Sequence, residues 1–578
     1  MGGIGMSLKT MPCTLGKFDI PIIQKQPPLI VDILDANIIV FGSSMSGKTS
    51  FIKNLINVLH KKYDEKNERI FILDFGGALT DYRNMPLVSA YYDNSNEEYV
   101  KRIFRIMDNI LKENIKELNG RNFREAENNQ PVHTTFFIDN FNAFAEEQRY
   151  SLYHEKFAKL CRDGLSKGIS IVVTAGETKG LSQYLANFRQ KIAFEMPADK
   201  YPEIFISKVG IIGNNPGHGF ANVTIKPEGV TGTFRMNLPY EVQCCFPEAA
   251  TDENSKFLAA LRKKFRYNEE SRSYEKCVKK YRTFPKELTR SIYREYIDDN
   301  AVNTAASVLC AGLDYVDFKP VAVDYEKSHV VAIYGKKEFG KTNLLNLMTD
   351  DLAAKIPGVR FVFLDDGREQ LAPVYKRFRD NVDCVMFDKF DKVRLTRKDG
   401  TEIQKKLSPL EQFFVYLNEN YIEFDKRMLA SYFDLSDQLK KDYENVPDCM
   451  NEVTPFTVFI IQSKLIYLNT LEGKRFMSSV LPQMAAVAEE RKYLFIFSDV
   501  QKLNEAELNS IFNNQISVGF LLDNIAEFAG ERGQRTIFGN MDVKYLKEEY
   551  AKCELGDGYC YDTEADKLQK LKFIKWDN

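Results

Sequence analysis

Residues Gly42–Ser50 read GSSMSGKTS and fit the pattern G-x-x-x-x-G-K-[ST], which is typical of loops that bind nucleoside triphosphates. Small residues let several backbone N–H groups converge on phosphate oxygens, and a helix that begins near Lys48 adds its positive N-terminal end. We expect Lys48 to reach the β- and γ-phosphates and the Thr49 hydroxyl to coordinate Mg²⁺, which prefers hard oxygen ligands. The predicted phosphate-binding set of this loop is Gly42, Ser43, Ser44, Met45, Ser46, Gly47, Lys48, Thr49 and Ser50.

A second oxygen ligand for Mg²⁺ is expected at the end of a buried strand. The stretch TTFFIDNF is apolar up to Asp139, whose carboxylate is predicted to help hold the metal ion. The next residue is Asn140, at a position where many ATPases carry Glu. An amide can hold a water molecule but cannot take its proton, so we predict slow hydrolysis by a catalytic set of Lys48, Asp139 and Asn140. Thr174 ends the following strand and is interpreted either as a sensor of the γ-phosphate or as a hydroxyl that bonds backbone.

A related loop, GKKEFGKTN, begins at Gly335. It keeps the glycines, the lysine and the threonine, but bulky residues fill its centre, and Glu338 is expected to bring negative charge near phosphate oxygens. The strand that should end in the Mg²⁺ acid carries Gln462 instead, and a neutral amide is a weak Mg²⁺ ligand. We therefore expect weak binding, or binding without turnover, by a loop that comprises Gly335, Lys336, Lys337, Glu338, Phe339, Gly340, Lys341 and Thr342.

The elements around the two loops repeat in the same order. Lys48 and Lys341 lie 293 positions apart (341 − 48), close to half of the 578 residues, so internal duplication is the first hypothesis. Each loop follows a short apolar run, precedes a helical pattern with apolar residues at i, i+3 and i+4, and is followed by a strand that ends in Asp. This strand–loop–helix–strand order predicts a βαβ unit of a parallel sheet.

The fold class predicted from these patterns is α/β, with two tandem nucleotide-binding domains that are each a mainly parallel sheet flanked by helices. Further apolar runs at 133–141, 170–177, 455–464 and 492–500 are interpreted as strands covered on both faces. We expect a first domain with the more intact site at residues 1–250. A linker at 251–300 and a degenerate second domain at 301–578 follow. The basic residues of the linker are interpreted either as a contact strip for nucleic acid or a neighbouring subunit or, because Glu is interleaved among them, preferably as a solvated helical face.

The composition gives no general attraction to nucleic acid or to anionic lipid, because the net charge is −2. The ten cysteines show no C-x-x-C pairs, and none of the five histidines has metal-ligand spacing, which favours a reducing compartment and no structural metal. No apolar run approaches the roughly 20 residues needed to span a bilayer.

The flanking segments resemble a known family. LGKFDIPIIQKQPPL before the first loop, then FILDFGGALTDYRNMPLV, TTFFIDNF and GIIGNNPGHGFANV, are similar to the C-terminal modules of EssC/EccC. These are FtsK/SpoIIIE-type, RecA-like ATPases of type VII protein secretion. AGLDYVDFKPVAVDY, FVFLDDG and LGDGYCYD fit the same plan in the second half.

This resemblance implies ATP and Mg²⁺ as cofactors and a location at the cytoplasmic side of the bacterial cell membrane. It further implies a hexameric full-length protein of which this chain is a C-terminal portion, with the transmembrane helices and a first ATPase module upstream. The implied partners are WXG-type secreted proteins and other subunits of the secretion machinery, and no nucleic acid. Two departures bear on activity: His218 replaces an Arg that the family has in a G-R-G turn, and Arg189 is interpreted as either an arginine finger or a plain surface residue.

Two other interpretations stay open at this level. A DNA translocase of the same superfamily would need a positive channel and an appended DNA-reading module, and salt-dependent DNA binding would identify it. A non-hydrolysing interaction platform would use nucleotide only to stabilise its fold, so nucleotide would raise the melting temperature without phosphate release.

Overall fold

The computed structural model divides into two compact units, Met1–Thr283 and Phe284–Asn578, which are described separately. It describes residues 8–21, 24–126, 130–205, 209–210, 212–213, 215–225, 239–281, 284–285, 287–299, 308–315, 318–365, 367–396, 400–422, 455–462, 470–499, 516–523 and 553–577. Residues 211 and 214 of the segment GIIGNNPGHGFANV, and residues 226–238 that follow it, lie outside the described residues.

The first unit is built on one ten-stranded mixed sheet with the order β2-β1-β10-β9-β8-β3-β7-β6-β4-β5. The six strands from β8 to β5 are parallel, and the other four extend the sheet in antiparallel fashion. The strands are β1 (Pro12–Asp19), β2 (Pro28–Asp32), β3 (Ile38–Phe41), β4 (Glu68–Asp74), β5 (Val88–Asp93), β6 (His133–Asp139), β7 (Ile169–Ala175), β8 (Gln190–Phe194), β9 (His218–Asn222) and β10 (Tyr240–Cys244).

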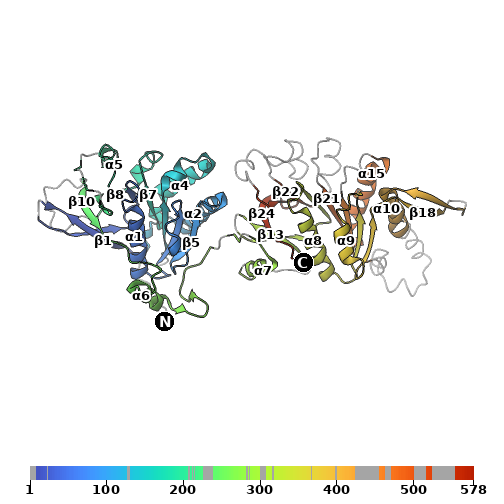
Figure 1. The fold of residues 1–578 in the computed structure, drawn as a ribbon, viewed down its shortest axis with the longest axis horizontal. Helices are drawn as coiled ribbons and strands as arrows, with labels where there is room; N and C mark the ends of the chain where they lie inside the picture. Colours follow the sequence, from blue (N-terminus) through green and yellow to red (C-terminus); the bar gives the residue numbers. More distant parts are fainter. Residues whose placement is uncertain are drawn as a thin grey trace. The chain divides into compact units, whose positions relative to one another are not determined.

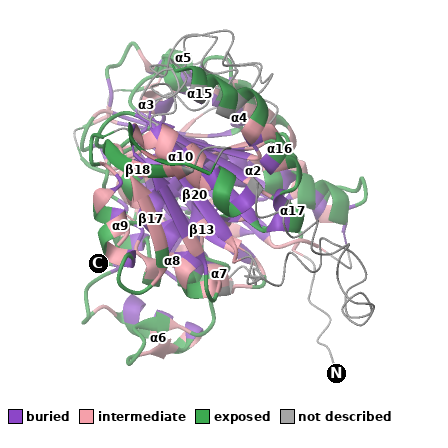
Figure 2. Ribbon diagram, turned by 90° about the vertical axis from the view of Figure 1, so that its right-hand side faces the viewer, coloured by how far each residue is buried: buried purple, intermediate pink, exposed green. Residues whose placement is uncertain are grey.

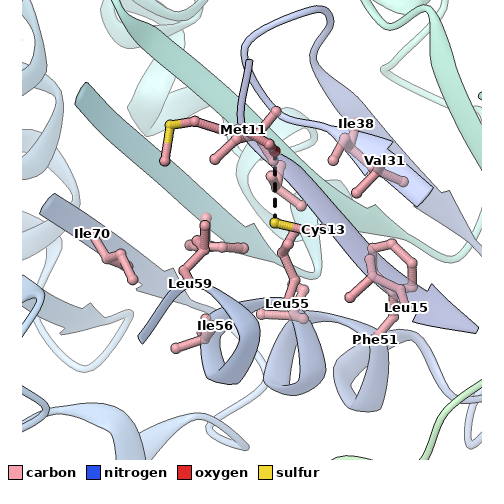
Figure 3. Packing of buried hydrophobic residues seen from close by; sticks show 14 of the residues in the cluster. Met11, Cys13, Leu15, Val31, Ile38, Phe51, Leu55, Ile56, Leu59 and Ile70 are labelled. Atoms are coloured by element: carbon pink, nitrogen blue, oxygen red, sulfur yellow. Dashed lines mark hydrogen bonds between the residues drawn. The ribbon is translucent and has the colours of Figure 1, made fainter. Parts of the chain in front are cut away.

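Helices cover both faces of this sheet (Figure 1), which explains why its central strands are apolar without interruption. Buried side chains of α1 and α6 pack on one face, and those of α2, α3, α4 and α5 pack on the other. Figure 3 shows Phe51, Leu55 and Leu59 of α1 among side chains of β1 and β3. The helices are α1 (Lys48–Lys62), α2 (Glu97–Glu117), α3 (Phe141–Ala145), α4 (Ser151–Asp163), α5 (Tyr201–Phe205) and α6 (Lys256–Phe265), and a small hairpin joins β11 (Tyr267–Asn268) to β12 (Ser273–Tyr274).

Helix ends follow from local chemistry. α1 begins directly after Gly47, and its last turn carries Lys61 and Lys62, which complement the negative C-terminal end of the helix dipole. α2 begins at Asn96, whose side chain accepts a hydrogen bond from the Glu98 N–H. The end of α1 and the start of α2 therefore lie where the sequence places basic residues and a capping side chain.

The second unit repeats the first strand for strand, so the predicted duplication is confirmed. Its ten-stranded sheet has the order β14-β13-β24-β23-β22-β15-β21-β20-β16-β17, in which β15 corresponds to β3 and β20 to β6. The strands are β13 (Val308–Asp314), β14 (Pro320–Asp324), β15 (Val330–Gly335), β16 (Arg360–Leu364), β17 (Asp383–Phe387), β20 (Thr457–Gln462), β21 (Tyr493–Asp499), β22 (Val518–Leu522), β23 (Asp557–Asp562) and β24 (Lys567–Phe573).

Helices also cover both faces of the second sheet, and Figure 2 shows its strand β20 buried beneath them. α8 and α9 contribute buried side chains on one face, and α10, α16 and α17 on the other. The helices are α7 (Arg290–Asp299), α8 (Lys341–Lys355), α9 (Ala372–Phe378), α10 (Pro409–Leu417), α15 (Leu471–Arg475), α16 (Leu481–Ala486) and α17 (Ala488–Arg491), and a separate two-stranded hairpin joins β18 (Asp391–Thr396) to β19 (Glu402–Leu407).

The fold confirms the α/β class with mostly parallel sheets. Within the described ranges, no helix is both long enough and apolar enough to cross a membrane. The cysteines that the structure describes are free thiols.

Candidate nucleotide site

The first loop connects β3 to α1 at the carboxyl edge of the parallel strands. Gly42 has φ +155° and Gly47 has φ +108°, values that favour glycine, and Met45 also adopts a positive φ of 62°. A Cβ on Gly47 would lie 2.6 Å from the Gly217 nitrogen, and one on Gly42 would lie 2.3 Å from Ser46 Oγ. Both glycines are thus required by the close packing of this loop.

Lys48 closes over the loop from the first turn of α1. Its Nζ donates hydrogen bonds to the Gly42 carbonyl at 2.7 Å and to the Ser43 carbonyl at 2.6 Å. Burial lowers the pKa of Lys48, and the charge of Asp139 opposes this shift. The ammonium group is therefore held at the loop by two backbone carbonyls. The oxygens of a bound anion can take the place of these carbonyls as hydrogen-bond acceptors.

Thr49, Asp139 and Thr174 meet beside the loop. The Thr49 hydroxyl donates to Asp139 Oδ2 at 3.2 Å, and the Thr174 hydroxyl donates to Asp139 Oδ1 at 2.5 Å. Burial raises the pKa of Asp139, and the nearby charge of Asp74 acts in the same direction, whereas the hydrogen bond from Thr174 lowers it. A divalent cation would remove this penalty by pairing with the carboxylate.

Asn140 follows Asp139 in a left-handed conformation with φ 60°. Its backbone N–H donates to the Thr174 hydroxyl at 2.8 Å, and its side chain is exposed. Thr174 thus bonds both a carboxylate and the backbone, so it positions the end of β6. A role for the Asn140 amide in holding water stays a prediction.

The residues fit a Mg²⁺–nucleoside triphosphate. Ser46 Oγ is buried within the loop and has no hydrogen-bond partner among the described residues, which suits a loop that closes around a ligand. Ser44 and Met45 are exposed at its tip, and Ser50 is half-buried on α1. Thr49 and Asp139 supply the hard oxygen donors that Mg²⁺ prefers, and Lys48 supplies the cation.

Asp74 is a further buried carboxylate at the carboxyl edge of the parallel strands, and the sequence pattern did not predict a role for it. It ends β4 and pairs in register with Asp139. Its carboxylate accepts hydrogen bonds from the N–H groups of Gly76, Gly77 and Leu79, and from the Tyr91 hydroxyl at 2.9 Å. Asp74 therefore shapes the loop after β4, which brings Gly76 so close that a Cβ there would lie 3.1 Å from Asp139 Oδ2.

The second loop has nearly the same backbone. Gly335, Glu338 and Gly340 have φ values of 155°, 68° and 102°, against 155°, 62° and 108° at the matching positions of the first loop. Lys341 Nζ donates to the carbonyls of Gly335 and Lys336, both at 2.7 Å. The bulky sequence is accommodated because the side chains of Lys336, Lys337 and Glu338 are exposed.

Glu338 illustrates this. It occupies the left-handed position of Met45, and its side chain is 84% exposed and lies 3.8 Å from Lys337. Lys336 and Lys337 are exposed as well, Thr342 is exposed on α8, and Phe339 packs partly against the core. The expectation that Glu338 brings charge to the phosphate oxygens stays a prediction.

The strand ends differ more between the units than the loops do. Gln462 ends β20 in place of Asp139, is buried, and donates to the Gln370 side chain. Ser498 pairs in register with Gln462 and so takes the place of Thr174. Asp365 repeats Asp74, because its carboxylate accepts hydrogen bonds from the N–H groups of Gly367, Arg368 and Leu371.

Arg189 and His218, which the family resemblance singled out, lie away from the carboxylate of Asp139. Arg189 precedes β8 and donates to the Asp35 carbonyl at 2.5 Å, so it lies at the amino edge of the sheet, opposite the first loop. His218 begins β9 and bonds Glu241 at 2.7 Å. Its neighbour Gly217 donates to the Ser46 carbonyl at 2.8 Å, which places this turn against the phosphate loop.

Comparisons with known proteins agree with this geometry. Residues 12–196 match the FtsK/SpoIIIE family. The type VII secretion system protein EssC of Staphylococcus aureus (strain MRSA252) is 23% identical over 378 residues, which cover 63% of this chain and 24% of that protein. The ESX secretion system protein EccC of Geobacillus thermodenitrificans is 23% identical over 357 residues, which cover 59% of this chain and 23% of that protein. The matches thus span about a quarter of these relatives.

Solved structures match along the whole chain. EssC (ATPases 2 and 3) from Geobacillus thermodenitrificans gives a TM-score of 0.63 at 18% identity, with 100% of this chain and 98% of that chain covered. Thermomonospora curvata EccC (ATPases 2 and 3), in complex with a signal sequence peptide, gives 0.58 at 15% identity, with 99% and 94% covered.

The resemblance seen in the sequence is therefore confirmed: residues 12–196 of the first unit match the FtsK/SpoIIIE family, and the chain is similar to the EssC/EccC ATPases of type VII secretion, with the fold of their ATPases 2 and 3.

Proposed function

We propose that this chain binds ATP with Mg²⁺ in its first unit and acts as the C-terminal ATPase portion of a type VII secretion motor that recognises or drives the export of WXG-type proteins. The observation that carries the proposal is the arrangement of Lys48, Thr49, Asp139 and Thr174 at one strand edge. The similarity to EssC and EccC supports the assignment to secretion.

Each residue of the first site has a defined task in this proposal. The loop amides and Lys48 bind the phosphates, and Lys48 exchanges its bonds to the Gly42 and Ser43 carbonyls for bonds to phosphate oxygens. Thr49 and Asp139 hold Mg²⁺, which when bound neutralises charge on the β- and γ-phosphates. Thr174 fixes the orientation of the carboxylate. Because Asn140 cannot accept a proton, hydrolysis by this unit alone is slow.

The second unit binds nucleotide without turnover in this proposal. Its loop keeps the backbone and the lysine of the first, but Gln462 provides no anionic oxygen for a metal ion. Thermomonospora curvata EccC was solved with a signal sequence peptide. By analogy, we assign recognition of secreted substrates to the paired ATPase units of this chain. Assembly into a hexamer with other machinery subunits at the cytoplasmic membrane face belongs to the same proposal.

Nucleotide binding by single-lysine variants tests the proposal. Isothermal titration with ATP and Mg²⁺ compares the wild type with Lys48→Ala and Lys341→Ala, and the exposed Lys66→Ala serves as control. We expect Lys48→Ala to abolish the tighter binding event, while Lys341→Ala and Lys66→Ala change it little. Equal losses in Lys48→Ala and Lys341→Ala would show that the ranking of the two sites is wrong, and no binding by the wild type would refute the ATPase assignment.

A further inference from the structure

The second unit carries an element that the first unit lacks. In the first unit, residues 94–95 join β5 to Asn96, which caps α2. In the second unit, residues 388–407 join β17 to Ser408, which caps α10. This longer connection holds β18 and β19, and we call these two strands together with Phe390 the arm. Because the same fold forms without a comparable element in the first unit, the arm is an insertion that the fold does not require.

The arm projects from the second unit as a separate two-stranded sheet (Figure 1) and is held firmly at its base. Gln412 of α10 donates to the Lys389 carbonyl at 2.7 Å and to the Leu407 carbonyl at 3.0 Å. Leu407 is 3% exposed, and Ser408 and Glu411 form a reciprocal capping box. The orientation of the arm is thus set before any partner arrives, which reduces the entropy lost on binding.

Three exposed cations share one face of the arm. Side chains alternate between faces along a strand, so Lys392 and Arg394 lie on the same side of β18. Lys406 of β19 pairs in register with Lys392 and therefore lies on that side as well. Like charges directly opposite each other destabilise a hairpin, and an anionic partner would remove this repulsion.

The charges of this face are not balanced within the described part of the chain. The ion pair on the arm joins Lys405, on the other face, to Glu411 at 3.4 Å. None of the described carboxylates lies within ion-pairing distance of Lys392, Arg394 or Lys406. Phe390 is 62% exposed beside them, with its ring centroid 5.7 Å from Lys406 Nζ. Glu402 lies on the same side of β19 as Lys406 and is exposed, yet three cations against one carboxylate leave the face with a net charge of +2 (3 − 1). The face thus combines net positive charge with one accessible aromatic ring.

We propose that the cationic face of the arm binds an acidic polypeptide segment of a partner protein. Lys392 and Arg394 are residues i and i+2 of β18, about 7 Å apart, and Lys406 lies opposite Lys392 on β19. An extended segment with alternating carboxylates has the same spacing, so its side chains match Lys392 and Arg394. A flat membrane fits this face less well, because Phe390 lies at the base of the arm. The arm is distinct from both phosphate loops, so the proposal does not depend on nucleotide binding.

Fluorescence anisotropy with the labelled peptide (Glu-Ser)₅ tests the proposal on the full chain, with (Gln-Ser)₅ as the uncharged probe. The triple variant Lys392→Gln/Arg394→Gln/Lys406→Gln neutralises the face, and Lys405→Gln is the matched control on the other face. A further variant replaces residues 388–407 with the Asn-Ser connection of the first unit. Guanidinium denaturation followed by the fluorescence of Trp576, which lies in the second unit, confirms for every variant that the unit carrying the arm is folded.

We expect the triple variant and the arm replacement to bind (Glu-Ser)₅ about tenfold more weakly than the wild type, since each exposed charge pair contributes modestly. Lys405→Gln should stay within about twofold, because it lies on the opposite face. Unchanged binding by the triple variant would overturn the proposal. So would tighter binding of phosphatidylserine vesicles or single-stranded DNA through the same three residues, which would assign the face to another polyanion.

Discussion

Acid should loosen the first unit through His60, on the last turn of α1. The ring is fully buried, its Nδ1 lies 2.8 Å from the Ile56 carbonyl, and its Nε2 lies 3.2 Å from the Leu87 nitrogen. The carbonyl requires a proton on Nδ1 and the N–H requires a lone pair on Nε2, so only the neutral tautomer satisfies both contacts. Burial lowers the pKa to about 3, and the charges of Lys280 and Lys264 act in the same direction.

The magnitude follows from linkage. The unfolded chain takes up a proton near pH 6.5, whereas the folded unit takes it up only near pH 3. The contribution to stability is therefore complete above pH 6.5 and is lost as the pH falls toward 3. At pH 5 the difference amounts to roughly 2 kcal/mol, from about 1.5 pKa units at 1.36 kcal/mol each.

Guanidinium denaturation at pH 7.5 and pH 5.0 measures this effect. The chain has one tryptophan, Trp576, whose indole N–H donates to Asp350 at 2.6 Å, so its fluorescence reports the second unit. Far-UV circular dichroism reports both units, and the transition that fluorescence does not follow belongs to the first. His60→Gln cannot titrate, so the wild-type first unit should lose about 2 kcal/mol more than the variant on acidification.

The fluorescence transition provides the internal control, because it should shift equally in wild type and variant. Equal losses by the first units of wild type and His60→Gln would refute the reasoning, since the buried ring would then contribute nothing to the acid sensitivity.

Three further outcomes are expected. Gly47→Ala should abolish ATP binding in calorimetry, because its Cβ would meet the Gly217 nitrogen at 2.6 Å, while Ser44→Ala at the exposed loop tip should bind normally. Thr174→Val should weaken ATP binding about tenfold with Mg²⁺ present and little without it, since the hydroxyl orients Asp139, and equal weakening in both conditions would contradict this role. His133→Phe should destabilise the first unit by about 3 kcal/mol in chemical denaturation, because it leaves the buried Glu68 without its partner. The double variant Glu68→Leu/His133→Phe should recover most of that loss, and a double variant no more stable than the single one would exclude the buried carboxylate as the cause.

Local patterns were sufficient to predict the class of fold and the two loops. A short apolar strand, a Gly-Lys-Thr turn and an amphipathic helix are each specified by neighbouring residues, and their repetition after 293 positions indicated the duplicated sheet that the structure has. The antiparallel strands of each sheet could not be predicted from local patterns. They come from both ends of the unit and pair across more than 200 residues, as β1 does with β10.

The second loop shows why side-chain direction needs the structure. In the sequence, Glu338 lies between two glycines of a phosphate loop, and this position predicts a negative charge near the ligand. In the structure the backbone at that position is left-handed, and the side chain is 84% exposed. Direction depends on φ and ψ, which the residue type alone does not determine.

By itself, the sequence determined the chemistry available at the first site, because Lys48, Thr49 and Asp139 sit at motif positions that local structure defines. Only the tertiary structure decided how these groups meet. The parallel register of three strands puts Thr174 on the Asp139 carboxylate and brings Asp74 alongside it, although 35 and 65 positions of sequence separate these residues from Asp139 (174 − 139 and 139 − 74). Contacts between distant segments depend on how whole strands pair, and that pairing is decided by the packing of the complete sheet.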